Sequence, residues 1–99
     1  MCIALGLGQT DMESRARGDL SARLGVALRD VRVVASEART WPDRRLGCLA
    51  RRGVEEPVPV PGYRIVVEAD AVRETYHTDR QGRMMRCETT SRRLLPMLR

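Results

Sequence analysis

The sequence is short of several residue types, and each absence excludes a class of protein. Its 99 residues contain no Lys, no Asn and no Phe, and Trp41, Tyr63 and Tyr76 are the only aromatic residues. No stretch approaches the roughly 18 consecutive apolar residues of a membrane span, so we expect no transmembrane segment. Proteins that bind single-stranded nucleic acid usually interleave basic residues with stacking aromatics, and this chain lacks that pattern. The length allows one domain.

All 18 basic residues are Arg, and they are unevenly distributed. Residues 1–79 carry 12 Arg and 12 acidic residues, so the whole net charge of +5 belongs to residues 80–99. A basic tail of this kind is one alternative for binding nucleic acid or an anionic surface. Its contacts would be Arg80, Arg83, Arg86, Arg92 and Arg93. The favoured interpretation is a solvated tail, because Arg replaces Lys throughout the chain.

The hydrophobic pattern begins with a helix. Apolar residues recur every four positions from Met12 to Leu24, which predicts an amphipathic helix of about 14 residues ending at Gly25. Thr10 and Glu13 have the spacing of a capping box at its start. Gly18 lies in the middle of this helix and weakens it by up to ~1 kcal/mol relative to Ala.

Four strands are predicted after the helix. Alternating side chains indicate strands near 31–40 and 63–69, which a long loop rich in Pro separates. Turns near Asp70 and over 79–82 lead to two further strands, near 72–78 and 84–88. We therefore expect an α+β fold, with one N-terminal helix packed on a four-stranded antiparallel sheet. The predicted organisation is a flexible segment over 1–10, a single domain over 11–88 and a basic tail over 89–99.

Three cysteines bear on stability and location. Cys48 and Cys87 lie 39 positions apart, and a bridge between them would contribute ~4 kcal/mol by the chain-entropy estimate. The alternative is a pair of buried free thiols, as in reducing compartments. Cys2 is expected to be a free thiol. The N-terminal stretch lacks the features of a signal peptide, so the chain as it stands indicates a cytoplasmic location.

Several motifs together resemble a family of small uncharacterised bacterial proteins, many of which look exported or lipoprotein-like. The motifs are Trp41-Pro42-Asp43, Leu46-Gly47-Cys48, Pro61-Gly62-Tyr63 and Tyr76-His77-Thr78. The resemblance covers about residues 18–88 and implies an extracytoplasmic ancestry. Ala71 stands where that family usually has a hairpin Gly, so a turn with positive φ is less expected here.

The candidate chemistry centres on His77, the only histidine. It could pair with Cys48 or Cys87 as a thiol–imidazole nucleophile, or join both cysteines and a carboxylate in a zinc site. The favoured interpretation is a surface or edge-strand His beside Asp79, with no metal, because the spacing of these residues gives no metal-site signal. Four glutamates could form an acid–base pair, but pairing with Arg64 or Arg73 is favoured. They are Glu55, Glu56, Glu68 and Glu74.

The predicted function is that of a non-enzymatic binding domain without a cofactor, with a protein as its partner. The contacts are placed in residues 41–61, because a long loop stiffened by Pro loses little entropy on binding. The candidate residues are Trp41, Pro42, Asp43, Glu55, Glu56, Val58 and Val60. Trp41 is either an anchor of the core or an exposed recognition residue. The alternatives are nucleic-acid binding through the tail and, because a helix followed by a meander is also the order in cystatins, a module resembling a protease inhibitor.

Overall fold

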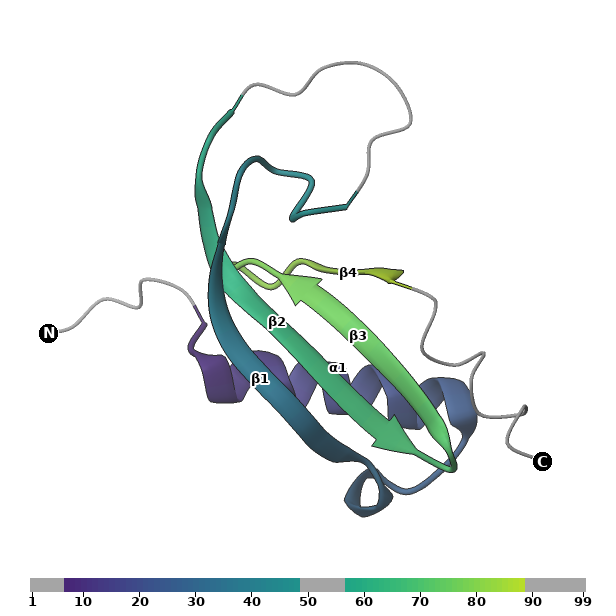
Figure 1. Ribbon diagram of the computed structural model, residues 1–99. Helices are drawn as coiled ribbons and strands as arrows, with labels where there is room; N and C mark the ends of the chain where they lie inside the picture. Colours follow the sequence, from purple (N-terminus) through teal and green to yellow (C-terminus); the bar gives the residue numbers. More distant parts are fainter. Residues whose placement is uncertain (1–6, 49–56, 89–99) are drawn as a thin grey trace, which may run out of the picture.

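One helix crosses one face of a four-stranded antiparallel sheet in the computed structural model, which describes residues 7–48 and 57–88 (Figure 1). The elements follow the order α1 (Gln9–Leu24), η1 (Leu28–Asp30), β1 (Arg32–Trp41), β2 (Val60–Ala69), β3 (Val72–Thr78) and β4 (Met84–Glu88). The strands lie side by side in sequence order, so β1 and β4 form the two edges. The α+β prediction is confirmed. None of the helices described has the length and apolar character of a membrane span.

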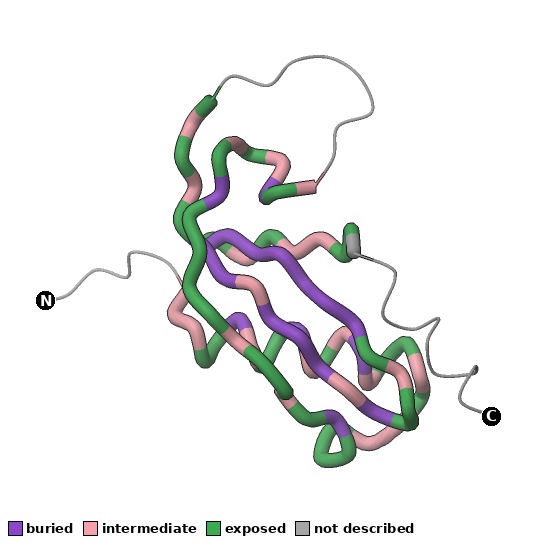
Figure 2. The backbone as a smooth tube through the Cα atoms, viewed as in Figure 1, coloured by how far each residue is buried: buried purple, intermediate pink, exposed green. Residues whose placement is uncertain are grey.

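The main core lies between α1 and the sheet. Met12, Ala16 and Leu20 are buried at the four-residue spacing seen in the sequence, which places them on one face of α1. Alternate residues of β2 meet them, and buried positions run along the centre of the sheet (Figure 2). The other members of the core are Val31, just before β1, and the sheet residues Tyr63, Ile65, Val67, Ala69 and Tyr76. We call the sheet face opposite α1 the outer face.

The start of α1 differs from the prediction. The helix begins at Gln9, and the Gly8 backbone N–H donates to Asp11 Oδ2 (3.1 Å), so Thr10 is inside the helix and does not cap it. Glu13 instead accepts a hydrogen bond from the Ser36 hydroxyl on β1 (2.6 Å). Leu7 N–H also donates to the Arg80 carbonyl. Residues 7–10, predicted to be flexible, therefore belong to the folded unit, because contacts with the sheet and the loop after β3 hold them.

The β2–β3 hairpin corrects a second expectation. Ala69 pairs with Val72, so Asp70 and Ala71 form a two-residue turn, with φ of 51° and 62°. Two positive φ values match the twist of the flanking strands in such a short connection. The tight register therefore imposes a left-handed conformation on an alanine, for which that conformation is unfavourable.

The strand limits agree closely with the sequence pattern. β3 and β4 have the predicted ends, β1 extends one position further to Trp41, and β2 begins three positions earlier at Val60. The additional pairs join Trp41 to Val60 and Thr40 to Pro61. The two strands therefore extend past the level of the helix, and this end of the sheet carries the candidate site.

Candidate functional site

A disulfide joins Cys48, in the segment after β1, to Cys87 on β4. The two Cα atoms are 5.6 Å apart, which is the usual separation across a disulfide. The two cysteines therefore have the geometry of the predicted bridge, and Cys87 is not buried, whereas the alternative of two buried free thiols requires its burial. Cys87 is exposed and Cys48 is half-buried. The bond connects the segment that leaves β1 to the opposite edge of the sheet.

Cys87 lies in a β-bulge of β4, on the outer face of the sheet. On β3, one residue separates Thr75 from His77, whereas on β4 two residues separate their partners Glu88 and Met85. Two residues of β4 thus oppose one of β3, which is the definition of a bulge, and bulges commonly redirect a side chain. Met85 pairs with His77 on the outer face, so regular alternation along β4 places Cys87, two residues further on, on that same face.

His77 lies against the disulfide and is buried. Its Nδ1 is 2.7 Å from the Leu46 carbonyl oxygen and 3.6 Å from Cys87 Sγ. A carbonyl can only accept, so Nδ1 carries the proton and donates it to Leu46. The prediction of a surface or edge-strand histidine is wrong, because β3 lies between β2 and β4 and the His77 side chain is 5% exposed.

Trp41 covers His77 on the outer face. The two rings are stacked, with centroids 4.4 Å apart, and the indole Nε1–H donates to the Thr78 carbonyl (2.8 Å). The guanidinium of Arg39 lies over the indole ring, 5.5 Å from its centroid. Trp41 is buried at 4% exposure, so it is an anchor and not an exposed recognition residue.

The segment between Trp41 and Cys48 is tightly packed. The Leu46 side chain is completely buried, and both Leu46 and Gly47 have positive φ, at 54° and 79°. A Cβ added at Gly47 would lie 2.6 Å from two atoms of the Trp41 ring, so only glycine fits there. We use the name disulfide cluster for Trp41, Leu46, Gly47, Cys48, His77 and Cys87.

The cluster includes three side chains of metal-ligating type. Cys48, His77 and Cys87 offer ligand atoms that all lie within 4.8 Å of one another, although their spacing in the sequence gave no such signal. In the oxidised form both sulfur atoms are bonded to each other. The donor set then lacks the thiolates that a zinc site of this composition requires.

A groove lies where β1 and β2 extend beyond the helix, and it is lined by other residues than those of the disulfide cluster. Its volume is about 220 Å³. Its lining consists of Ala38, Arg39, Thr40, Pro61, Gly62, Tyr63 and Arg80. Among the residues described, two arginines and no carboxylate line the groove, although Arg39 also pairs with Glu37 (2.8 Å). The sequence alone gave no reason to group Arg80 with β1 and β2, because Arg80 follows β3 and meets these strands only in the folded structure.

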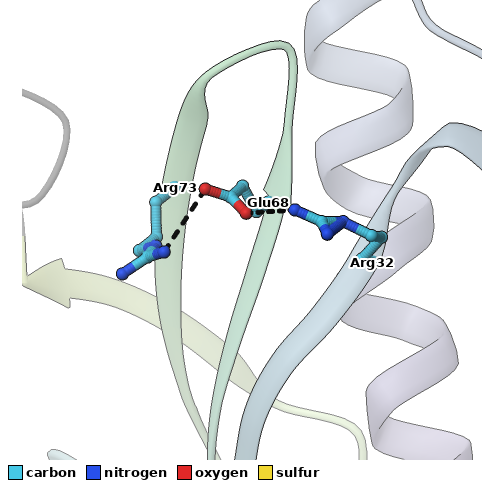
Figure 3. Close-up of polar contacts among 3 residues, drawn as sticks. All are labelled: Arg32, Glu68 and Arg73. Carbon is cyan, nitrogen blue, oxygen red and sulfur yellow. Dashed lines mark hydrogen bonds and ion pairs between the residues drawn. The ribbon is translucent and has the colours of Figure 1, made fainter. Parts of the chain in front are cut away.

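Of the four candidate glutamates, the two that the structure describes, Glu68 and Glu74, do not form an acid–base pair. Glu68 lies between Arg32 and Arg73 and pairs with both (Figure 3). The hydrogen bond from Arg32 holds the pKa of Glu68 below its ordinary value, and the charge of Arg73 adds to this effect. Glu74 is 3.9 Å from Arg86 and lies on the α1 face, whereas Glu68 lies on the outer face. The predicted pairing with Arg73 is confirmed for Glu68.

The remaining candidate residues are scattered. Pro42 is exposed, and Asp43, Val58 and Val60 are half-buried. Arg83 is exposed, and Arg86 is occupied with Glu74. Glu55, Glu56, Arg92 and Arg93 lie outside the described residues, as does the predicted tail over 89–99.

The chain belongs to the family described as a domain of unknown function (DUF8738), whose model matches residues 13–87. This match extends from α1 to Cys87 and contains both cysteines of the bridge. It agrees with the resemblance to an uncharacterised family. No curated protein and no solved structure matches the chain, so the comparison with cystatins stays an analogy of element order.

Proposed function

We propose that this domain is a non-catalytic binding module that takes an acidic segment of a partner protein. The binding surface is formed by residues 41–61 together with the adjoining groove. The observation that carries the proposal is the exposed Arg80, which lines the groove together with Arg39 and with no carboxylate among the described lining residues. Arginine is suited to this role, because its planar guanidinium donates two parallel hydrogen bonds to a carboxylate.

The disulfide cluster supports this role by holding the surface in place. Residues 41–48 are held to the sheet by the ring stack, the bond from Trp41 Nε1 to Thr78 and the covalent link to Cys87. A surface ordered before binding loses less conformational entropy when the partner docks. Trp41 thus contributes to binding as an anchor, and the contacts with the partner fall to exposed side chains beside it.

The test uses a library of random peptides displayed on phage, selected on the immobilised full chain. We expect enrichment of peptides that contain Asp and Glu, with binding reduced at least tenfold by Arg80→Glu. The matched control is Arg29→Glu, which reverses an exposed charge on η1, outside the groove.

Two results would overturn the proposal. One is the absence of enriched sequences, and the other is a set of peptides that binds both variants equally. Binding of a DNA oligonucleotide in preference to any peptide, with affinity that falls steeply as salt rises, would instead favour the nucleic-acid alternative.

A further inference from the structure

We propose that Cys48–Cys87 is a thiol–disulfide exchange site, which a dithiol opens while the domain stays folded. The group that assists the exchange is the Nδ1–H of His77, which lies beside one of the two sulfur atoms. This activity is separate from the binding surface proposed above. It follows from the accessibility of the bond, from the donor beside it and from the backbone that leads to it.

The sulfur atoms are within reach of a partner. Cys87 is exposed and sits in a bulge of the edge strand β4, and Cys48 is half-buried at the end of a segment on the surface. The main core lies on the other face of the sheet, between β2 and α1. An incoming thiolate therefore meets the bond without having to separate the helix from the sheet.

His77 supplies a donor for the sulfur that leaves. Its Nδ1–H points to the Leu46 carbonyl at 2.7 Å, and Cys87 Sγ is 3.6 Å from the same nitrogen. When the bond opens, Cys87 becomes a thiolate, which is a much stronger acceptor than a disulfide sulfur. The proton of Nδ1 then has a charged acceptor within reach. A donor in this position stabilises the thiolate and makes it a better leaving group.

The backbone before Cys48 favours opening as well. Leu46 has a φ of 54°, in the left-handed region that is unfavourable for a residue with a Cβ. Such conformations persist only where surrounding contacts enforce them. Gly47 follows with a φ of 79°, so two consecutive residues turn the chain sharply to bring Cys48 to Cys87.

The exchange runs in two balanced steps. The thiolate of the dithiol attacks Cys48 Sγ, a mixed disulfide forms, and the electron pair of the broken bond goes to Cys87 Sγ beside His77. The second thiol of the reagent, once deprotonated, attacks its own sulfur in the mixed disulfide and releases Cys48, and both released thiolates are protonated at equilibrium. The chain gains two electrons and two protons, and the dithiol becomes a cyclic disulfide.

The experiment measures reduction by dithiothreitol of the full chain carrying Cys2→Ser, so that only the two bridged cysteines report. Free thiols are trapped by alkylation and counted by mass at increasing urea concentrations. We expect a rate that is independent of urea below the unfolding transition, because opening requires no unfolding. A rate that follows global unfolding throughout would overturn the proposal and leave a purely structural disulfide.

Two variants separate the donor from general loosening of the cluster. His77→Phe retains a ring to stack on Trp41 but removes the N–H, and we expect reduction about tenfold slower. Trp41→Phe removes the bond to Thr78 while leaving the His77 donor in place, and we expect no slowing. Equal effects of the two variants, or faster reduction of His77→Phe, would overturn the role of His77.

Discussion

The two faces of the sheet are held in different ways. Under α1, apolar side chains such as Leu20, Ile65 and Val67 are fully buried against one another. On the outer face, the disulfide cluster is held by a ring stack, the hydrogen bonds of Trp41 and His77, and one covalent bond. Burial of apolar area is non-directional, whereas stacks, hydrogen bonds and disulfides have strict geometry.

The difference shows how a small domain stabilises the part of its sheet that α1 does not cover. A chain of this length buries only a little over 60% of its unfolded surface, so one apolar core leaves it marginally stable. The cluster adds a second region in which each residue has an individual role. Substitutions under α1 should therefore have graded effects that follow apolar volume, whereas substitutions in the cluster should depend on one atom or one bond.

Removing the disulfide should have the largest effect on the free energy of unfolding. For Cys48→Ala combined with Cys87→Ala we expect a loss of about 4 kcal/mol in the free energy of unfolding, because the unfolded chain regains the freedom of a long loop. Urea unfolding at neutral pH measures it. A loss below about 1 kcal/mol would show that the main core alone sets the stability, contrary to the comparison.

Adding one methyl group should change stability in opposite directions in the two regions. Gly47→Ala should lose about 2 kcal/mol, because its Cβ meets the buried Trp41 ring at 2.6 Å and its φ is 79°. Gly18→Ala, in the middle of α1 with no atom within 4 Å of the added Cβ, should gain about 1 kcal/mol from helix propensity. Thermal unfolding of both variants measures whether each substitution lowers or raises the unfolding temperature. Equal shifts would contradict the packing of the cluster.

A polar contact at the rim of the main core gives a smaller effect that depends on pH. Tyr76 donates to Asp19 Oδ2 (2.6 Å), and its loss in Tyr76→Phe should lower stability by about 1.5 kcal/mol at neutral pH. Burial, with the bond to Asp19, raises the pKa of Tyr76 above its ordinary value of 10.0.

The sign of this pH dependence follows from the direction of the shift. Above pH 10 the unfolded chain loses the phenol proton and the folded chain keeps it, so stability falls as pH rises. Tyr76→Phe should remove this contribution. Urea unfolding of both proteins between pH 7 and 11 measures it, and an equal slope in the two would contradict the assignment.

The turn between β2 and β3 offers the smallest effect. Ala71→Gly should raise stability by about 0.5 kcal/mol, because glycine adopts a φ of 62° without the clash of a Cβ. Ala38→Gly, at an exposed position of β1 outside the left-handed region, is the matched control and should lower it by a similar amount. A loss at both positions would mean that the turn does not strain Ala71.

The predicted elements were most accurate where a local pattern carried them. The period of Met12, Ala16 and Leu20 located α1, and the turn residues near Asp70 and over 79–82 located β3 and β4 with their ends. The errors fall where contacts between distant segments decide. The capping box at Thr10 was wrong because Glu13 bonds to Ser36 on β1. The expectation for Ala71 was wrong because the pairing of Ala69 with Val72 requires a two-residue turn.

The same division applies to the candidate site. The bridge was foreseeable as one of two alternatives, because the count and positions of the cysteines permit it. The burial of His77 was not foreseeable from the sequence, since it depends on which strands flank β3. Whether Cys87 meets Cys48 could not be decided from the sequence either, because it depends on how the segment after β1 lies against the sheet.

By itself, the sequence determined the order of the elements, the apolar face of α1 and the neutrality of residues 1–79, since each depends on neighbours along the chain. Only the tertiary structure decided that Trp41, His77 and the disulfide form one cluster, and that Arg39 and Arg80 line one groove. Those contacts join segments far apart in the chain, which only strand pairing and the packing of the loops bring together.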